Sequence, residues 1–449
     1  MREVVFLLAF LVLFVLSFRR PFVAVSLWLW SGLFVPIYWL YGGFASSISY
    51  NSLFAFSAMA GYFIYKKKPD FKITALFLVV ILLFIHTTIT SFTALVYPTV
   101  VWMSWENFAK GILLFLFISL IIRKQHHFNL VLWGVVLSIG FIGFVEGLKF
   151  IASGGGHHIK GPDGNILSDN NHMAVAMCMT LPFIIYLISE TEEKLLKWGL
   201  KIMLIICTLA ILGTFSRGGL IGLVMILGYF WINSKHKFKA LLAAMLIAVI
   251  AYNYLPTSWY KRMDTIDTAM EDGSFTTRVN SWKIHTLMAL DRPLIGGGFK
   301  GPQVSYVWTR LATKIDMFDF IPTPPPGDKG WAAHSIYFEM LGDQGFPGIF
   351  FFLSCIFLSF RKLVSIEKYY RKLKEDDAWQ SRLAKMFKVS IVAYCVAGAA
   401  VSLAYLEMFY SVLALVVALD LVVRADKKLR LNMQNTSLDN QKSKVKGVL

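Results

Sequence analysis

Residues 73–92 read ITALFLVVILLFIHTTITSF, and none of these side chains is an Asp, Glu, Lys or Arg. An α-helix rises about 1.5 Å per residue, so a run of roughly 20 apolar residues crosses the hydrocarbon core of a bilayer. The run is continuous, whereas the strands of a membrane barrel alternate apolar and polar residues. We therefore predict a transmembrane helix here.

Similar runs recur along most of the chain. Of its 449 residues, 57% are hydrophobic and only 16% are charged, and the mean hydropathy is +0.60, whereas about a quarter of the residues of a soluble domain are charged. The predicted fold is all-α, a polytopic helical membrane protein with about 12–13 transmembrane helices and one large extracytoplasmic loop domain. The predicted spans are 4–18, 21–41, 48–65, 73–92, 107–122, 128–151, 172–189, 197–214, 218–233, 238–255, 347–360, 388–405 and 409–424.

Basic residues cluster at every second connection between these runs and account for most of the formal net charge of +17. By the positive-inside rule, such connections lie in the cytoplasm. The clusters are Arg19/Arg20, 66–68 with Lys72, Arg123/Lys124, Lys194/Lys197/Lys201, Lys235/Lys237/Lys239, 361–388 and the tail from Arg424. The loops 93–106, 152–171, 215–217, 256–333 and 406–408 are then predicted on the opposite side. No zinc-knuckle, helicase or basic-helix signature accompanies the charge, so nucleic-acid binding is not predicted.

Composition divides the chain into four parts. Residues 1–255 form an N-terminal transmembrane bundle, 256–346 a large extracytoplasmic loop, 347–424 the C-terminal transmembrane helices, and 425–449 a basic cytoplasmic tail. Loops as long as the second part are usually functional, and this one contains a predicted amphipathic helix, 277–290. The polar composition of the tail predicts disorder. The cysteines lie in apolar runs without metal-ligand spacing and are interpreted as packing residues.

Arg217 is the only charged residue of a tight outer turn, Thr214-Phe215-Ser216-Arg217-Gly218-Gly219. It precedes a predicted helix, whose free N–H groups and dipole already favour an anion. A cation at a helix N-terminus is unfavourable unless an anion binds there, so the position of Arg217 suggests a bound anion. An arginine that reaches out to lipid headgroups is the alternative interpretation.

A second motif opens the amphipathic helix of the long loop. Arg278 and Trp282 are four residues apart and share one helix face. The motif continues to Arg292 and to the three glycines 296–298, which let the backbone approach a ligand or a neighbouring helix closely. A flexible surface turn explains such a glycine-rich loop equally well.

His334 stands where the long loop re-enters the membrane. It precedes a short predicted helix that contains Glu339 and ends at Gly342, and Pro347 suits the first turn of the next helix. A histidine at this boundary is suited to proton transfer near neutral pH. A structural histidine with a hydrogen bond in the fold is the alternative interpretation.

The loop 154–172 contains the paired histidines His157 and His158. No carboxylate or cysteine follows them at a ligand spacing, so no metal site is predicted. The loop ends in Ser168-Asp169-Asn170-Asn171-His172, in which Ser168 or Asp169 is a candidate N-cap of the next helix. Lys110, Glu146 and Lys149 lie near outer helix ends and could complete a polar rim, whereas His86 is predicted to make a core hydrogen bond.

These motifs converge because the charge pattern predicts Arg217, Arg278, His334 and the loop 154–172 on the same side of the membrane. Two guanidinium groups suit a diphosphate, since their fixed geometry matches phosphate oxygens. One histidine suits a general base. Apolar helices beneath them can hold a long lipid tail.

With these motifs the chain resembles the O-antigen ligase superfamily, which also contains O-antigen polymerases. The resemblance rests on Ser216-Arg217-Gly218-Gly219, on Arg278 to Trp282 with Arg292 to Phe299, and on His334-Ser335-Ile336-Tyr337-Phe338-Glu339. Gly161-Pro162 and Asp169-Asn170-Asn171 point to the branch of exosortase-A-associated O-glycosylation ligases.

The resemblance implies a metal-independent, cofactor-free glycosyltransferase of the bacterial inner membrane with its active site in the periplasm. The donor would be a glycan on undecaprenyl diphosphate, and the acceptor either the lipid A–core of lipopolysaccharide or a protein hydroxyl. His334 takes the place of the family's catalytic histidine, and Arg217 and Arg278 that of its diphosphate-binding arginines. Further substrate contacts are expected from Lys110, Lys149, Asp169, Asn170, Trp282, Arg292 and Glu339.

Two other functions remain open at this point. An O-antigen polymerase of the same superfamily would carry the same motifs, because only the acceptor differs. A transporter or flippase for the lipid-linked glycan ranks third, since transporters place polar sites near the midplane between related halves. Here the charges collect at the outer rim and no internal repeat is visible.

Overall fold

The computed structural model describes residues 2–40, 43–66, 68–234, 236–239 and 273–446, together with the single positions 242, 245, 246, 249 and 257. The described residues are largely helical, and no strand occurs among them. The all-α prediction is therefore confirmed. The predicted span 238–255 lies mostly outside the described residues.

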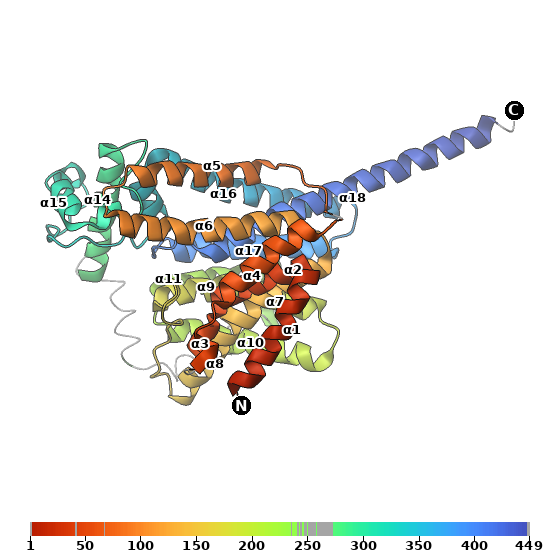
Figure 1. Ribbon diagram of the computed structural model, residues 1–449, viewed down its shortest axis with the longest axis horizontal. Helices are drawn as coiled ribbons and strands as arrows, with labels where there is room; N and C mark the ends of the chain where they lie inside the picture. The colour runs from red at the N-terminus through yellow and green to blue at the C-terminus, as the bar shows by residue number, and fades with distance from the viewer. Residues whose placement is uncertain are drawn as a thin grey trace.

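The helices are named in chain order (Figure 1). They are α1 (Arg2–Arg19), α2 (Pro21–Phe34), α3 (Gly43–Ser46), α4 (Tyr50–Ile64), α5 (Ala75–Phe92), α6 (Pro98–Ile121), α7 (Gln125–Val135), α8 (Phe141–Ala152), α9 (Asn170–Glu190), α10 (Lys194–Gly213), α11 (Arg217–Asn233), α14 (Gly273–Asp291), α15 (Ser305–Ala312), α16 (Ile336–Lys372), α17 (Trp379–Gly398) and α18 (Glu407–Lys446). A π-helical turn, Val136–Gly140, joins α7 to α8.

Seven helical stretches of the described chain are long and apolar enough to cross a membrane, which confirms a polytopic membrane protein. They are Ala75–Phe92, Pro98–Ile121, Gln125–Ala152, Asn170–Glu190, Lys194–Gly213, Ile336–Lys372 and Glu407–Thr436. The helices α2 and α11 are shorter and apolar. The predicted runs 4–18 and 48–65 are also helical, as α1 and α4.

Two helices begin well before the predicted spans, and charged side chains near the predicted starts are paired. Helix α6 begins at Pro98 rather than 107, and Glu106 forms an i,i+4 ion pair with Lys110 at 2.7 Å. Helix α17 begins at Trp379 rather than 388 and ends at Gly398, so the predicted loop 406–408 is in fact the connection 399–406. Lys388 pairs there with Glu367 at 2.6 Å. Hydropathy alone started both helices at their apolar runs and missed the turns that precede those runs.

Helices α16 and α18 are longer than predicted. The predicted break after Gly342 lies at Gly345, whose φ of 68° is non-helical, and the helix that follows it continues to Lys372 rather than ending at 360. Helix α18 runs on to Lys446, so the tail that composition predicted to be disordered is helical up to that residue. Figure 1 shows this part of α18 projecting beyond the rest of the molecule.

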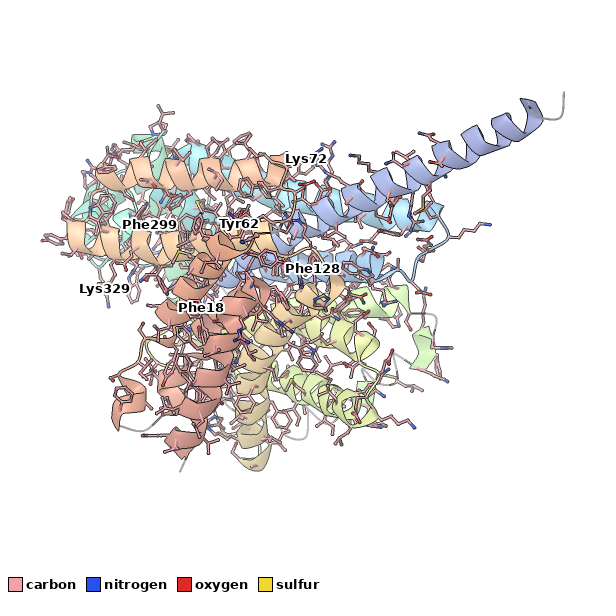
Figure 2. The ribbon with its side chains drawn as sticks, turned by 45° about the vertical axis from the view of Figure 1, so that its right-hand side comes forward. Phe18, Tyr62, Lys72, Phe128, Phe299 and Lys329 are labelled. Carbon is pink, nitrogen blue, oxygen red and sulfur yellow. The ribbon has the colours of Figure 1, made fainter. Side chains whose placement is uncertain are left out.

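The connections gather at two ends of the bundle, in the two sets that the basic clusters predict. At the first, which we call the basic end, Arg123 donates to the carbonyl of Asp70 (3.4 Å). At the second, the loop end, the amide of Leu95 donates to the carbonyl of Gly297 (2.9 Å). In Figure 2, Lys72 and Lys329 mark these opposite ends. The end that faces the cytoplasm stays a prediction.

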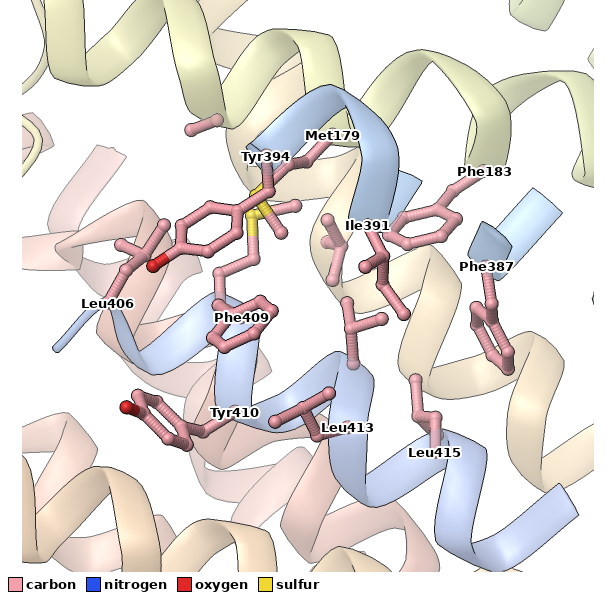
Figure 3. Packing of buried hydrophobic residues seen from close by; sticks show 14 of the residues in the cluster. Met179, Phe183, Phe387, Ile391, Tyr394, Leu406, Phe409, Tyr410, Leu413 and Leu415 are labelled. Carbon is pink, nitrogen blue, oxygen red and sulfur yellow. The ribbon is translucent and has the colours of Figure 1, made fainter. Parts of the chain in front are cut away.

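The core beneath the loop end is built by α9, α17 and α18 (Figure 3). Tyr394 of α17 stacks on Phe409 of α18 with ring centroids 4.1 Å apart. Its hydroxyl donates to the carbonyl of Leu403 (2.8 Å), and that of Tyr410 donates to the carbonyl of Ala404 (3.0 Å). These tyrosines fix the connection 399–406, which reaches the candidate site.

Candidate active site

The backbone of His334 is held in an uncommon conformation. Its φ is +47°, in the left-handed region, where histidine is found more often than most residues. Its amide donates to Oγ of Ser402 (2.8 Å), in the connection between α17 and α18. The preceding carbonyl, of Ala333, accepts a hydrogen bond from the indole of Trp282 (2.8 Å). Two distant segments thus fix the peptide groups around this half-buried histidine.

Helix α14 brings Arg278 toward His334. The predicted amphipathic helix 277–290 is confirmed as this helix, and the ring of Trp282 stacks on Phe338 with centroids 5.3 Å apart. Lys283, 6% exposed, ties α14 to the loop that follows by donating to the carbonyl of Ile321 (2.6 Å). The packing of α14 against α16 therefore places Arg278 and His334 at one site.

The electrostatic surroundings of His334 favour its neutral form. Burial lowers the pKa of His334 below its ordinary value of 6.5, and the positive charge of Arg278 lowers it further. Asp169 raises the pKa and His172 lowers it, both more weakly. A lowered pKa leaves the imidazole unprotonated at neutral pH, which is the state in which it can accept a proton.

Arg217 begins α11 after a strained turn. Phe215 has a φ of +57°, and the hydroxyl of Ser216 caps the helix by accepting from the amide of Gly219 (3.1 Å). A Cβ on Gly219 would lie 2.6 Å from Cβ of Ala174, so only glycine lets α11 approach α9 this closely. The packing of its neighbours therefore determines the position of the half-buried Arg217.

The loop 154–172 packs onto the same turn. His158 Nε2 lies 3.2 Å from the carbonyl of Thr214, and the amide group of Asn170 donates to the same oxygen (2.7 Å). Asp169 is the N-cap of α9, since its carboxylate accepts from the amides of Asn171 and His172. Of the two predicted caps, Asp169 is thus the one used, and Ser168 is not.

The structure joins these segments through α17. A Cβ on Gly218 would lie 3.1 Å from the carbonyl of Ala397, so α11 rests on the end of α17. Five residues further on, in the connection 399–406, Ser402 accepts the hydrogen bond from the amide of His334. Arg217, Arg278, His334 and Asp169 accordingly belong to one region at the loop end, as the charge pattern predicted.

The four other predicted substrate contacts each have a partner within the chain. Lys110 pairs with Glu106, and Lys149 pairs with Glu146, which also lies 2.6 Å from His157. Arg292 donates to the carbonyl of Thr93 (2.8 Å). The carboxylate of Glu339, 8% exposed, accepts from the amide of Ala404 (2.8 Å).

Two further predictions concern contacts between segments. The amides of Gly297 and Gly298 donate to the carbonyls of Gly342 and Asp343, so the glycines serve a close approach to α16. His86 lies 2.8 Å from the carbonyl of Gln344, which confirms its core hydrogen bond.

Sequence reasoning missed Ser402 and His285. Ser402 fell inside a predicted span, and no pattern in the chain marks it. His285 is fully buried in α14, its Nδ1 lies 2.7 Å from the carbonyl of Ser281, and burial lowers its pKa to about 4. Its place seven residues after Arg278, on the same helix face, was a signal that could have found it.

The fold and this region define a polytopic helical membrane protein that gathers two arginines and a histidine at one end of its bundle. Residues 202–353 match the family described as O-antigen ligase, and this range contains Arg217, Arg278 and His334. Residues 1–192 match a family of unknown function (DUF5935). No curated protein matches the chain.

This match supports, over residues 202–353, the resemblance to the O-antigen ligase superfamily that the motifs imply. The match supports a glycosyltransferase-like ligase or polymerase, a class that uses a lipid-linked glycan and an acceptor. The exosortase-associated branch stays a prediction.

Proposed function

We propose that the protein is a ligase that transfers a glycan from undecaprenyl diphosphate to an acceptor hydroxyl on the periplasmic face of the inner membrane. The acceptor is the lipid A–core of lipopolysaccharide or a protein hydroxyl. The observation that carries the proposal is the position of His334, whose backbone is fixed by Ser402 and Trp282 and whose pKa is lowered beside Arg278.

In this reaction the acceptor oxygen attacks the anomeric carbon of the donor sugar. The bond from that carbon to the diphosphate oxygen breaks, and lipid diphosphate leaves. His334 accepts the hydroxyl proton, because its imidazole is neutral at working pH. Arg217 and Arg278 bind the diphosphate and stabilise the charge that grows on the leaving oxygen.

The proposal is tested with His334→Ala and His334→Asn, since asparagine also adopts the left-handed backbone conformation readily. Removal of a general base lowers the rate by roughly 10²–10⁴-fold. Donor binding should change little, because a neutral imidazole adds little to diphosphate affinity. The matched control is His126→Ala, an exposed histidine at the basic end.

Turnover and donor binding are measured separately on purified protein in detergent. Wild-type turnover by a correctly folded His334→Asn protein would contradict the assignment of the base. A chelator should leave turnover unchanged, and loss of activity that a divalent ion restores would contradict the metal-independent mechanism. Failure to form any product from donor and acceptor would favour a transporter instead.

A polymerase is separated from a ligase in cells that lack the protein. Loss of a ligase leaves long polymer on undecaprenyl diphosphate, whereas loss of a polymerase leaves single repeats that are still transferred. Glycan profiling of a deletion strain therefore decides between the two.

A further inference from the structure

A cleft with a volume of about 550 Å³ lies at the basic end, between the last turns of α16 and the exposed part of α18. Four cations line it, Arg361, Lys368 and Lys372 from α16 and Lys427 from α18. Phe360 and Val364 line it as well. Its residues have no role in the reaction proposed above.

The cations of this cleft lack carboxylate partners. Among the described residues, none of the four forms an ion pair, although carboxylates lie on the same helices. Those carboxylates are occupied by other cations: Glu367 by Lys388, Asp420 by Lys362 and Arg424, and Asp426 and Glu375 by Arg430. The cleft therefore gathers four cations, none of which forms an ion pair with a described carboxylate.

One face of α16 changes from apolar to cationic along the cleft. Phe360, Val364, Lys368 and Lys372 follow one another at intervals of four, so they lie on one side of the helix. The first two are apolar and the last two cationic. Across from them, Nζ of Lys427 lies 4.2 Å from the ring centroid of Tyr369, which holds this cation at the cleft.

Helix α16 is one of the membrane-spanning candidates, and this face lies at its end. An apolar surface that continues into a cationic one matches a lipid, with its acyl chain beside the apolar residues and its phosphate at the lysines. Basic pockets between transmembrane helices bind anionic headgroups in this way. Lys368 lies 34 residues after His334, roughly 50 Å along a helix, so the diphosphate of the donor is not the occupant.

We propose that this cleft binds an anionic phospholipid, with the phosphate of the headgroup at Arg361, Lys368, Lys372 and Lys427. Phe360 and Val364 contact the acyl chain. The proposal concerns the end of the molecule opposite to the catalytic histidine and does not depend on the ligase reaction.

The test compares two triple variants of the full-length protein. Lys368→Gln, Lys372→Gln and Lys427→Gln together neutralise three cations of the cleft. Lys194→Gln, Lys374→Gln and Lys428→Gln remove the same charge from exposed lysines that do not line it. Binding of phosphatidylglycerol, phosphatidylcholine and inorganic phosphate is measured by native mass spectrometry of the protein released from detergent.

The wild type and the control triple should retain phosphatidylglycerol in preference to phosphatidylcholine. The cleft triple should lose affinity for phosphatidylglycerol by a factor on the order of 10², from three cations near a membrane surface. Equal losses in both triples, or equal retention of the two lipids by the wild type, would overturn the proposal. Displacement of phosphatidylglycerol by inorganic phosphate at equal concentration would show a soluble phosphate site instead.

Discussion

Buried carboxylates have different partners at the two ends of the bundle. At the basic end, the largely buried carboxylates of Glu190, Glu367 and Asp420 each lie 2.5–3.1 Å from a Lys or Arg nitrogen. At the loop end, the buried Glu339 and Asp343 receive hydrogen bonds from the amide of Ala404 and the hydroxyl of Tyr405.

This difference indicates which charges stabilise the fold and which serve the proposed reaction. Cations at the basic end hold helices together, because a buried carboxylate needs a partner. At the loop end, neutral groups hold Glu339 and Asp343, and Ser402 holds His334. The cations of that end, Arg217 and Arg278, are the ones that the proposed reaction uses.

The largest effect is expected from breaking a buried ion pair at the basic end. Lys388→Met leaves Glu367 without its cation and should lower the free energy of unfolding by about 3–5 kcal/mol. The double variant Lys388→Met, Glu367→Gln removes both charges and should recover most of the loss. Denaturant titration in detergent measures both, and equal stability of the single and double variants would refute the role of the pair.

Removing a guanidinium at the loop end should weaken donor binding rather than folding. Arg217→Ala or Arg278→Ala deletes a charge-assisted hydrogen bond to phosphate, worth about 1.5–3 kcal/mol, and should raise the donor Kd by roughly 10–100-fold. Lysine at either position should restore binding only in part, since it lacks the planar fork. Arg371→Ala, at the exposed basic end, is the control. Unchanged donor affinity in both variants would exclude a diphosphate contact.

A smaller effect is expected from the hydrogen bond that fixes His334. Ser402→Ala removes it, at about 0.5–1.5 kcal/mol, and should reduce kcat several-fold with an unchanged donor Kd. Ser402→Thr keeps the hydroxyl and should retain most of the activity. A loss of donor affinity in place of kcat would show that Ser402 acts on the lipid rather than on the histidine.

The smallest effect concerns the pH profile. The base form of His334 is present above its pKa, so activity should fall on the acid side below the ordinary value of 6.5. Arg278→Ala removes a positive charge that lowers this pKa, and the acid limb should move to higher pH. Asp169→Asn keeps the helix cap but removes a charge that raises it, and the limb should move to lower pH. Shifts in the same direction would contradict the arrangement.

The sequence predicted the fold class and the convergence of the motifs because both follow from hydropathy and charge. Helix starts were less predictable where a helix begins before its apolar run, as α6 does before residue 107 and α17 before residue 388. Ser402 could not be predicted, because its contact with His334 joins positions 68 residues apart. The sequence left the glycine motif 296–298 open between a close backbone approach and a flexible surface turn. The packing of these glycines against α16 shows the close approach.

The length of α18 has a practical consequence for labelling. The helix has 40 residues, and its part after the predicted span, from about residue 425, is roughly 30 Å long at 1.5 Å per residue. A fluorophore coupled near its end would be carried well clear of the bundle, as Figure 1 shows for the ribbon. Energy transfer from that point to a dye at Lys194 would report the angle at which α18 leaves the bundle.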